Sequence, residues 1–236
     1  MTEAGTLEAF RASGHTLGNV EGDFIEWHRG RPFYYCWMVM VDSSAWNSAA
    51  REAALRLRRW LLSGYARQSH VTILPGGFPR RGSLDMSAIS ACVRRILPFR
   101  ISLGPLGSFT SSPCFEVVDP DAMLGRLRSA LRPVLRDPLA QVSDASYLPH
   151  LTVGLYRDCF STGGIAAAIE SFPPVSVESV IQVDWISLCA YDTSSIKGPL
   201  TEVARVELGS GRTNVLGHAE LFRNGYDDRT GCRRSP

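Results

Sequence analysis

The chain has 236 residues, of which 44% are hydrophobic and 20% are charged, and its formal net charge is +2. The length allows a substantial core, and the composition is that of a globular protein rather than a disordered or fibrous one. The small net charge argues against a protein that wraps long nucleic acid, but it leaves small anionic ligands and nucleic-acid ends open.

The cysteines and the apolar segments indicate the environment of the protein. The six cysteines include no Cys-x-x-Cys pair, which argues against zinc and thioredoxin-like motifs and predicts reduced core residues. The N-terminus lacks a signal-peptide core, and the longest apolar stretch, 33–41, is too short to span a bilayer. We therefore expect a cytoplasmic monomer with no membrane contact, no metal and no cofactor.

The first predicted elements are a strand, a helix and a second strand. Residues 32–42 are aromatic and β-branched, which favours a buried strand. Asp42 and the two serines after it are typical N-cap residues. Residues 45–64 carry leucine and alanine at helical intervals up to a final glycine, as a helix with an αL cap would. The strand "SHVTIL", residues 69–74, follows.

The same order of elements then occurs a second time. A predicted strand at 114–119 ends in an aspartate, an amphipathic helix follows at 120–137, and a strand with a histidine follows within 147–156. The capping aspartate precedes the histidine by 31 residues here and by 28 residues in the first unit. This agreement indicates an internal duplication.

Each unit continues with another helix and another strand. The predicted pairs are 84–96 with 98–106 and 163–172 with 175–191, and a last strand is predicted at 201–209. Duplicated β-α-β-α-β units predict an α+β fold with two lobes, related by pseudo-twofold symmetry around a central cleft. The predicted organisation is an N-terminal extension at 1–31, one bilobal domain at 32–209 with repeats at about 32–112 and 113–209, and a polar tail at 210–236 whose composition is compatible with disorder.

The best candidate for a functional site is a His-x-Thr pattern that occurs once in each unit. Alternate residues of a strand share a face, so His70 projects with Thr72 and His150 projects with Thr152. Two imidazoles and two hydroxyls that meet in one cleft suit phosphodiester chemistry. One imidazole takes a proton, the other gives one, and the hydroxyls donate hydrogen bonds to phosphate oxygens.

A single pattern of this kind usually belongs to a histidine with a structural role. From average residue usage, a given histidine meets the pattern roughly once in forty, so two matches among five histidines arise on the order of once in a hundred chains. Their equivalent places in the duplicated unit favour the functional reading further. A structural role for both motifs is the alternative.

The two motifs also resemble those of a known superfamily. The segments "HVTI" at 70–73 and "PHLTVG" at 149–154 are similar to the motifs of the two-histidine (2H) phosphoesterases, which include the bacterial 2′-5′ RNA ligases and the cyclic phosphodiesterases. The resemblance covers roughly residues 32–209. It implies a bilobal fold around a cleft and chemistry on phosphodiesters of a ribose 2′ oxygen, usually without a metal.

The resemblance also implies a role for each motif residue. His70 would be the proton donor to the leaving oxygen, and His150 would be the base that activates water. Thr72 and Thr152 would hold the phosphate of the substrate.

The first motif departs from a regular strand, because it runs into Pro75 and two glycines and so predicts a short strand. The segment "GGFPRRGS" that follows is read as an exposed turn. The alternative is a lid that brings Arg80 and Arg81 to the substrate.

These observations lead to one main function. It is a metal-independent phosphodiesterase that opens a 2′,3′-cyclic phosphate on a nucleotide or an RNA end and leaves a 2′-phosphomonoester. The alternatives are 2′-5′ RNA ligation by the same groups, and a nucleotide- or RNA-end-binding module without turnover. The sequence does not distinguish RNA ends from cyclic nucleotides, ADP-ribose cyclic phosphates or other phosphodiesters.

Overall fold

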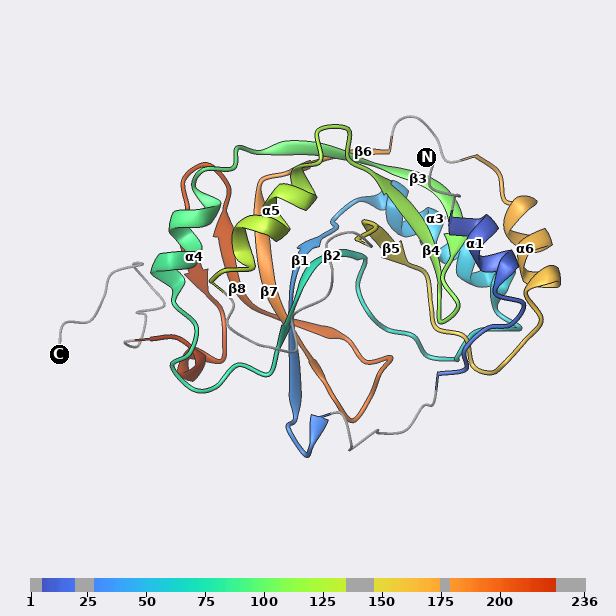
Figure 1. Cartoon of the computed structure of the whole chain (residues 1–236), viewed down its shortest axis with the longest axis horizontal. Helices are drawn as coiled ribbons and strands as arrows, with labels where there is room; N and C mark the ends of the chain where they lie inside the picture. Colours follow the sequence, from blue (N-terminus) through green and yellow to red (C-terminus); the bar gives the residue numbers. More distant parts are fainter. Residues whose placement is uncertain (1–5, 20–27, 135–146, 175–178, 224–236) are drawn as a thin grey trace.

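A computed structural model of the chain describes residues 6–19, 28–134, 147–174 and 179–223. Figure 1 shows the helices gathered at the two ends of a long, twisted sheet. The elements in chain order are α1 (Thr6–Ala12), β1 (Phe33–Met40), α3 (Ser44–Leu57), β2 (His70–Gly77), α4 (Met86–Val93), β3 (Phe99–Ser108), β4 (Pro113–Val118), α5 (Met123–Leu131), β5 (His150–Thr152), α6 (Thr162–Glu170), β6 (Val180–Val183), β7 (Trp185–Asp192), β8 (Leu200–Glu207), β9 (Thr213–Val215) and the 3-10 turn η3 (Ala219–Leu221).

The described strands form one sheet in the order β6-β3-β4-β5-β2-β1-β7-β8-β9, and each strand pairs antiparallel with its neighbours. The strands that carry the two motifs, β2 and β5, are neighbours in the middle of this order. Their unit partners flank them, with β1 beside β2 and β4 beside β5. The arrangement confirms the predicted α+β fold with two halves of equivalent construction.

The third strand of each unit crosses to the other half of the sheet. Strand β3 belongs to the first unit but pairs with β4, and β7 belongs to the second unit but pairs with β1. Each half of the sheet is therefore built from both units. Of the single strand predicted at 175–191, residues 175–178 lie outside the described residues; the rest forms two strands, β6 and β7, which lie in opposite halves. No glycine or proline marks the break at Asp184, so the sequence pattern runs through it.

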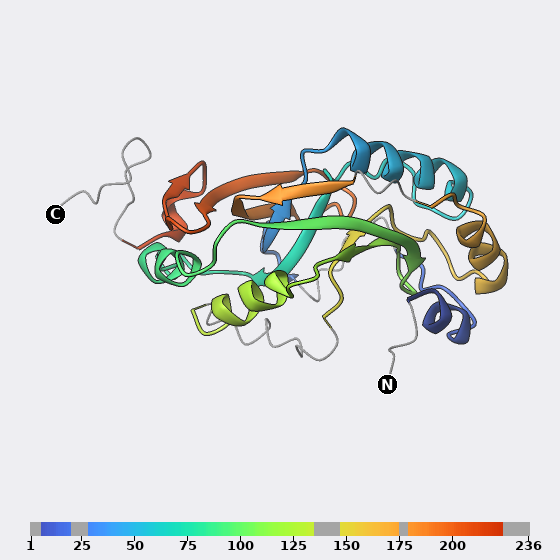
Figure 2. The same ribbon diagram turned by 90° about the horizontal axis from the view of Figure 1, so that it is seen from above.

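The helices are divided between the two ends of the sheet. Figures 1 and 2 show α1, α3 and α6 at one end and α4 and α5 at the other. The strand side chains beneath them form one continuous core with the helices, with Trp37, Val71, Ile73, Phe115 and Leu151 among its fully buried members. Val71 and Ile73 on β2 and Leu151 on β5 alternate with the motif residues, so the motifs point to the opposite side. We call that side the histidine face.

Two helix starts follow the predicted capping pattern. The Ser43 side chain accepts a hydrogen bond from the backbone N–H of Trp46 at the start of α3. The Asp119 carboxylate accepts from the backbone N–H groups of Met123 and Leu124, at 3.0 and 2.7 Å, at the start of α5. Each carboxylate or hydroxyl satisfies N–H groups that the first helical turn leaves without an intrahelical partner.

Two predicted boundaries in the first unit are wrong. Helix α3 ends at Leu57 rather than at Gly64, because the chain turns and Leu61 forms a β-bridge with Tyr156. Strand β2 is not short: it continues through Pro75 to Gly77, and its pairing with β1 contains two irregularities in register, one of which falls at Gly76. The proline and glycines therefore do not end the strand.

The terminal segments contribute more to the fold than their composition indicates. Phe10 of α1 is 2% exposed, and its ring stacks on that of Tyr156 with centroids 6.0 Å apart. At the other end, β9 extends the sheet, and Leu221 and Phe222 are buried. The described α1 of the extension and the first part of the tail are thus packed on the domain, and disorder is the wrong expectation for 210–223. The rest of the tail lies outside the described residues.

The described cysteines are all free thiols, and Cys232 lies outside the described residues. Within the described ranges, none of the helices combines the length and apolar character that a membrane crossing requires.

Candidate active site

The two motifs face each other across a single pair of strands. Val71 of β2 lies opposite Leu151 of β5 in antiparallel register. In such a pair, the residues on either side of this point also lie opposite one another. His70 therefore faces Thr152, and Thr72 faces His150, all on the histidine face. The structure brings together the four residues that the sequence analysis singled out.

This register sets the size of the candidate site. Directly opposite side chains of an antiparallel pair have Cβ atoms about 5 Å apart, and diagonal neighbours lie about 7–8 Å apart. Each histidine is thus next to the threonine of the other motif, and the two histidines are diagonal to each other. A gap of that size between two imidazoles can hold one phosphate group, with a hydroxyl on either side.

Both histidine rings are held in the same way. The Nδ1 atom of His70 lies 2.7 Å from the backbone oxygen of Gln68, and Nδ1 of His150 lies 2.8 Å from that of Leu148. A carbonyl oxygen only accepts, so Nδ1 carries the proton in both rings. The Nε2 atom of each neutral imidazole therefore keeps its lone pair, which is the state that a general base needs.

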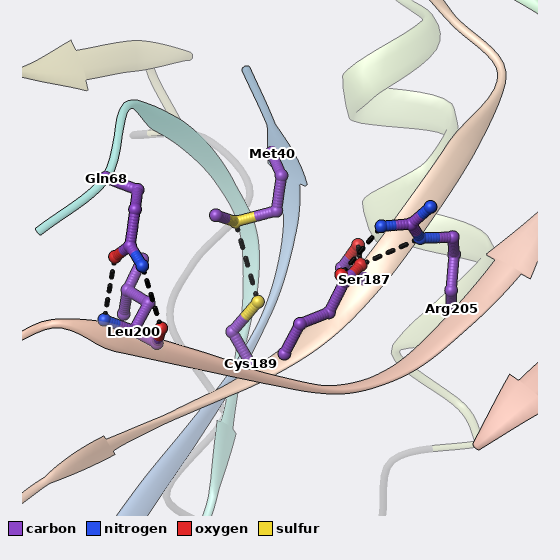
Figure 3. Close-up of polar contacts among 7 residues, drawn as sticks. Met40, Gln68, Ser187, Cys189, Leu200 and Arg205 are labelled. Atoms are coloured by element: carbon purple, nitrogen blue, oxygen red, sulfur yellow. Dashed lines mark hydrogen bonds and ion pairs between the residues drawn. The ribbon is translucent and has the colours of Figure 1, made fainter. Parts of the chain in front are cut away.

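Further contacts fix the carbonyl groups that orient the rings. The Gln68 side chain makes two hydrogen bonds to the backbone of Leu200, of 3.0 and 2.8 Å, which Figure 3 shows as a pair of dashed lines. On the other strand, the Tyr147 hydroxyl donates to the backbone oxygen of Thr72, and the oxygen of Pro149 accepts from the backbone N–H of Val117. Both segments that precede the histidines are thus tied to the sheet.

Burial lowers the pKa of both histidines. The pKa of His70 falls from 6.5 to about 4, mainly because the ring is desolvated. The hydrogen bond to Gln68 opposes this shift, whereas the positive charges of Arg67 and His150 add to it. The pKa of His150 is lowered by burial as well, and its hydrogen bond to Leu148 opposes that change. Both rings are therefore mainly neutral at neutral pH in the free protein.

The two threonine hydroxyls remain available to a ligand. The side chains of Thr72 and Thr152 are half-buried, and neither hydroxyl has a hydrogen-bond partner in the described part of the chain. Among the same residues, no group of three or more histidine, cysteine, aspartate or glutamate side chains is placed to hold a metal ion.

The immediate neighbours of the motifs come from the flanking strands. On β1, Met40 pairs with His70 and Met38 pairs with Thr72, and on β4, Glu116 pairs with His150. Met40 also contacts the thiol of Cys189 on β7 at 3.6 Å (Figure 3). Sequence analysis did not predict these neighbours, because cross-strand pairing is a long-range property.

An aromatic ring closes one side of His150. Phe109, between β3 and β4, meets the imidazole edge to face with the ring centroids 4.8 Å apart. No local pattern in the sequence marks this residue.

Arg80 and Arg81 are exposed, in a turn that is closed by a hydrogen bond from the backbone N–H of Ser83 to the oxygen of Arg80. This agrees with the prediction of an exposed turn for this segment.

Comparisons with known proteins agree with this arrangement. The model of the 2′-5′ RNA ligase superfamily matches residues 41–192, which include both motifs. No match is found among curated proteins.

Similar solved structures include that of E. coli LigT complexed with 3′-AMP, at 17% identity and a TM-score of 0.50, covering 75% of this chain and 99% of that chain. A structure described as a phosphoesterase has 20% identity and a TM-score of 0.50 over the same shares of the two chains. The protein TT0787 of Thermus thermophilus has 17% identity and a TM-score of 0.50, with 76% and 100% of the chains covered. These likenesses show a shared fold.

Proposed function

Because the chain belongs to the 2′-5′ RNA ligase superfamily, we propose that it is a metal-independent phosphodiesterase that opens 2′,3′-cyclic phosphates and leaves 2′-phosphomonoesters. The observation that carries the proposal is the register of β2 and β5, which places the two imidazoles diagonal to each other and each of them opposite a free hydroxyl. The substrate is a nucleotide or an RNA end that bears a cyclic phosphate. Binding of 3′-AMP to E. coli LigT is compatible with such a ligand.

The proposed reaction uses each motif residue once. His150 Nε2 takes a proton from water as the water oxygen attacks phosphorus. The bond between phosphorus and the 3′ oxygen breaks, and His70 Nε2 gives its proton to that oxygen. Thr72 and Thr152 donate hydrogen bonds to the non-bridging oxygens, where negative charge increases in the transition state. A second proton transfer between the histidines and solvent restores the starting state.

The acid role requires a protonated His70, although burial favours its neutral form. A bound phosphodiester brings a negative charge next to the ring, and a nearby opposite charge raises the pKa of a base. Substrate binding and protonation of His70 are therefore coupled in this proposal. The free protein holds a neutral ring, and the complex holds an imidazolium.

Phosphorus NMR tests the proposed activity. The protein is mixed, in the presence of EDTA, with a 2′,3′-cyclic nucleotide and separately with an oligonucleotide that ends in a cyclic phosphate. We expect the cyclic signal to be replaced by that of a 2′-phosphomonoester. His70→Asn and His150→Asn each keep a side-chain donor near the position of Nδ1 but remove Nε2, so both should abolish turnover.

The matched control is His15→Asn, because His15 is exposed and lies outside the site. It should leave turnover unchanged. Full activity in either motif variant would refute the two-histidine mechanism. Formation of a longer product from an oligonucleotide with a cyclic end and one with a free 5′ hydroxyl would support the alternative of 2′-5′ ligation. Binding without any turnover would support the binding-module alternative.

A further inference from the structure

Arg67 lies three residues before His70, in a segment that is firmly attached to the sheet. The backbone N–H of Ala66 donates to the oxygen of Lys197, and the Gln68 side chain is bonded twice to Leu200 (Figure 3). The oxygen of Ser69 accepts from the N–H of Val41. The position of the Arg67 backbone is therefore fixed by the residues on both sides of it.

The Arg67 side chain extends over the histidine face. Its guanidinium carbon lies 4.3 Å from the ring centroid of Tyr191 on β7, and a hydrogen bond between the two side chains opposes the rise in the tyrosine pKa that burial causes. Tyr191 packs against the small cluster formed by Met38, Cys189 and Leu200, which is separate from the main core under the helices. A guanidinium that stacks on an aromatic ring uses its flat face for the contact, so the edge N–H groups that the tyrosine does not engage can bind an anion bidentately.

The charge of Arg67 is not neutralised within the described part of the chain. No carboxylate pairs with it there, and its Nε atom is buried without a hydrogen-bond partner. The other such buried side-chain atom in this part is Nε1 of Trp37, which is fully enclosed in the main core. Arg205 provides the contrast, because its guanidinium forms an ion pair of 2.7 Å with Glu202 and also stacks on an aromatic ring.

A buried donor without a partner destabilises the folded state, so such a group in a folded protein calls for an explanation. A phosphate oxygen would satisfy Nε and balance the charge at the same time. The charge of Arg67 also lowers the pKa of His70, but it is not among the causes that shift the pKa of His150. The anion would therefore sit on the His70 side of the motif pair.

We infer that Arg67, stacked on Tyr191, forms a second phosphate-binding subsite beside His70, which takes a phosphate group of the substrate other than the one that reacts. The reacting phosphate is surrounded by the four motif side chains between β2 and β5. Strand β7 lies two strands from β2, which is a distance of about 10 Å across the sheet. The inference rests on the proposed function in one respect, since it takes the ligand to be a nucleotide.

Calorimetric titration with two ligands tests the subsite without any turnover. The ligands are 3′-AMP, which carries one phosphate, and adenosine 3′,5′-bisphosphate, which carries two. We expect the wild-type protein to bind the bisphosphate at least tenfold more tightly. Arg67→Gln should bind both ligands with similar affinity. Arg56→Gln is the matched control, because it removes the same charge from an exposed ion pair on α3, and it should keep the preference.

Three results would overturn the inference: equal affinities in the wild-type protein, a preference that persists in Arg67→Gln, or no binding of either ligand. If Arg67→Gln does not fold, Arg67→Lys keeps the charge but loses the planar fork, and it should reduce the preference severalfold; an unchanged preference would overturn the inference too. A protein that binds both ligands with the expected preference but opens no cyclic phosphate would refute the proposed activity and leave the subsite in place.

Discussion

Replacement of His70 should change how the stability of the protein depends on pH. The pKa of His70 is about 4 in the folded chain, against 6.5 for an unperturbed histidine. Between these values the unfolded chain binds a proton that the folded chain does not, so the free energy of unfolding falls as the pH decreases through this window. The full difference corresponds to roughly 3 kcal/mol, at about 1.4 kcal/mol for each pH unit.

Most of this effect lies in an accessible range. From the two pKa values, His70 alone should remove roughly 2 kcal/mol of stability between about pH 7 and about pH 5. His70→Asn retains a donor near Gln68 but cannot titrate, so the variant should lose that much less stability over the same range. His150, whose pKa is also lowered by burial, contributes in the same direction to both proteins and cancels in the comparison.

Urea unfolding of the two proteins at both pH values measures the difference directly. The midpoint and the slope should be determined in each case, because an altered slope would indicate a change in the unfolded state rather than in the folded one. Equal losses of stability in the wild-type protein and in His70→Asn would refute the argument that burial keeps the ring neutral.

Three further substitutions test the contacts around the site. Gln68→Ala removes the two side-chain hydrogen bonds to Leu200, so the backbone carbonyl of residue 68, which orients the His70 ring, is held less firmly. The variant should therefore lower kcat roughly tenfold with little change in KM; steady-state kinetics would disprove this if only KM rose. Arg128→Met should cost about 2 kcal/mol in urea unfolding, because the buried Arg128 donates a 2.8 Å hydrogen bond to the oxygen of Ile73; a loss below experimental error would contradict it. Tyr156→Phe should lower stability by only about 1 kcal/mol in thermal unfolding, since Ser108 keeps other acceptors, and a much larger loss would show that the hydroxyl has another role.

Local patterns predicted the elements of the fold with few errors. The capping residues Ser43 and Asp119 act within one helical turn, so their roles follow from the neighbouring sequence alone. The errors concern boundaries and pairing, together with α1 and β9, which lie in the terminal segments where no element was predicted. Helix α3 stops at Leu57, shortly before Leu61 pairs with Tyr156, which is almost a hundred residues away. The described part of the segment 175–191 divides because β6 and β7 pair with different strands. Tertiary contacts of this kind leave no local signal.

The sequence by itself determined the duplicated α+β plan, the family resemblance and the two His-x-Thr pairs, because alternation along a strand decides which side chains share a face. Only the tertiary structure decided that His70 lies opposite Thr152, since that depends on the register of β2 and β5. It also decided the lowered pKa values and the place of Arg67 over Tyr191. Desolvation and charge depend on everything packed around a group, and residues distant in sequence supply most of that surrounding.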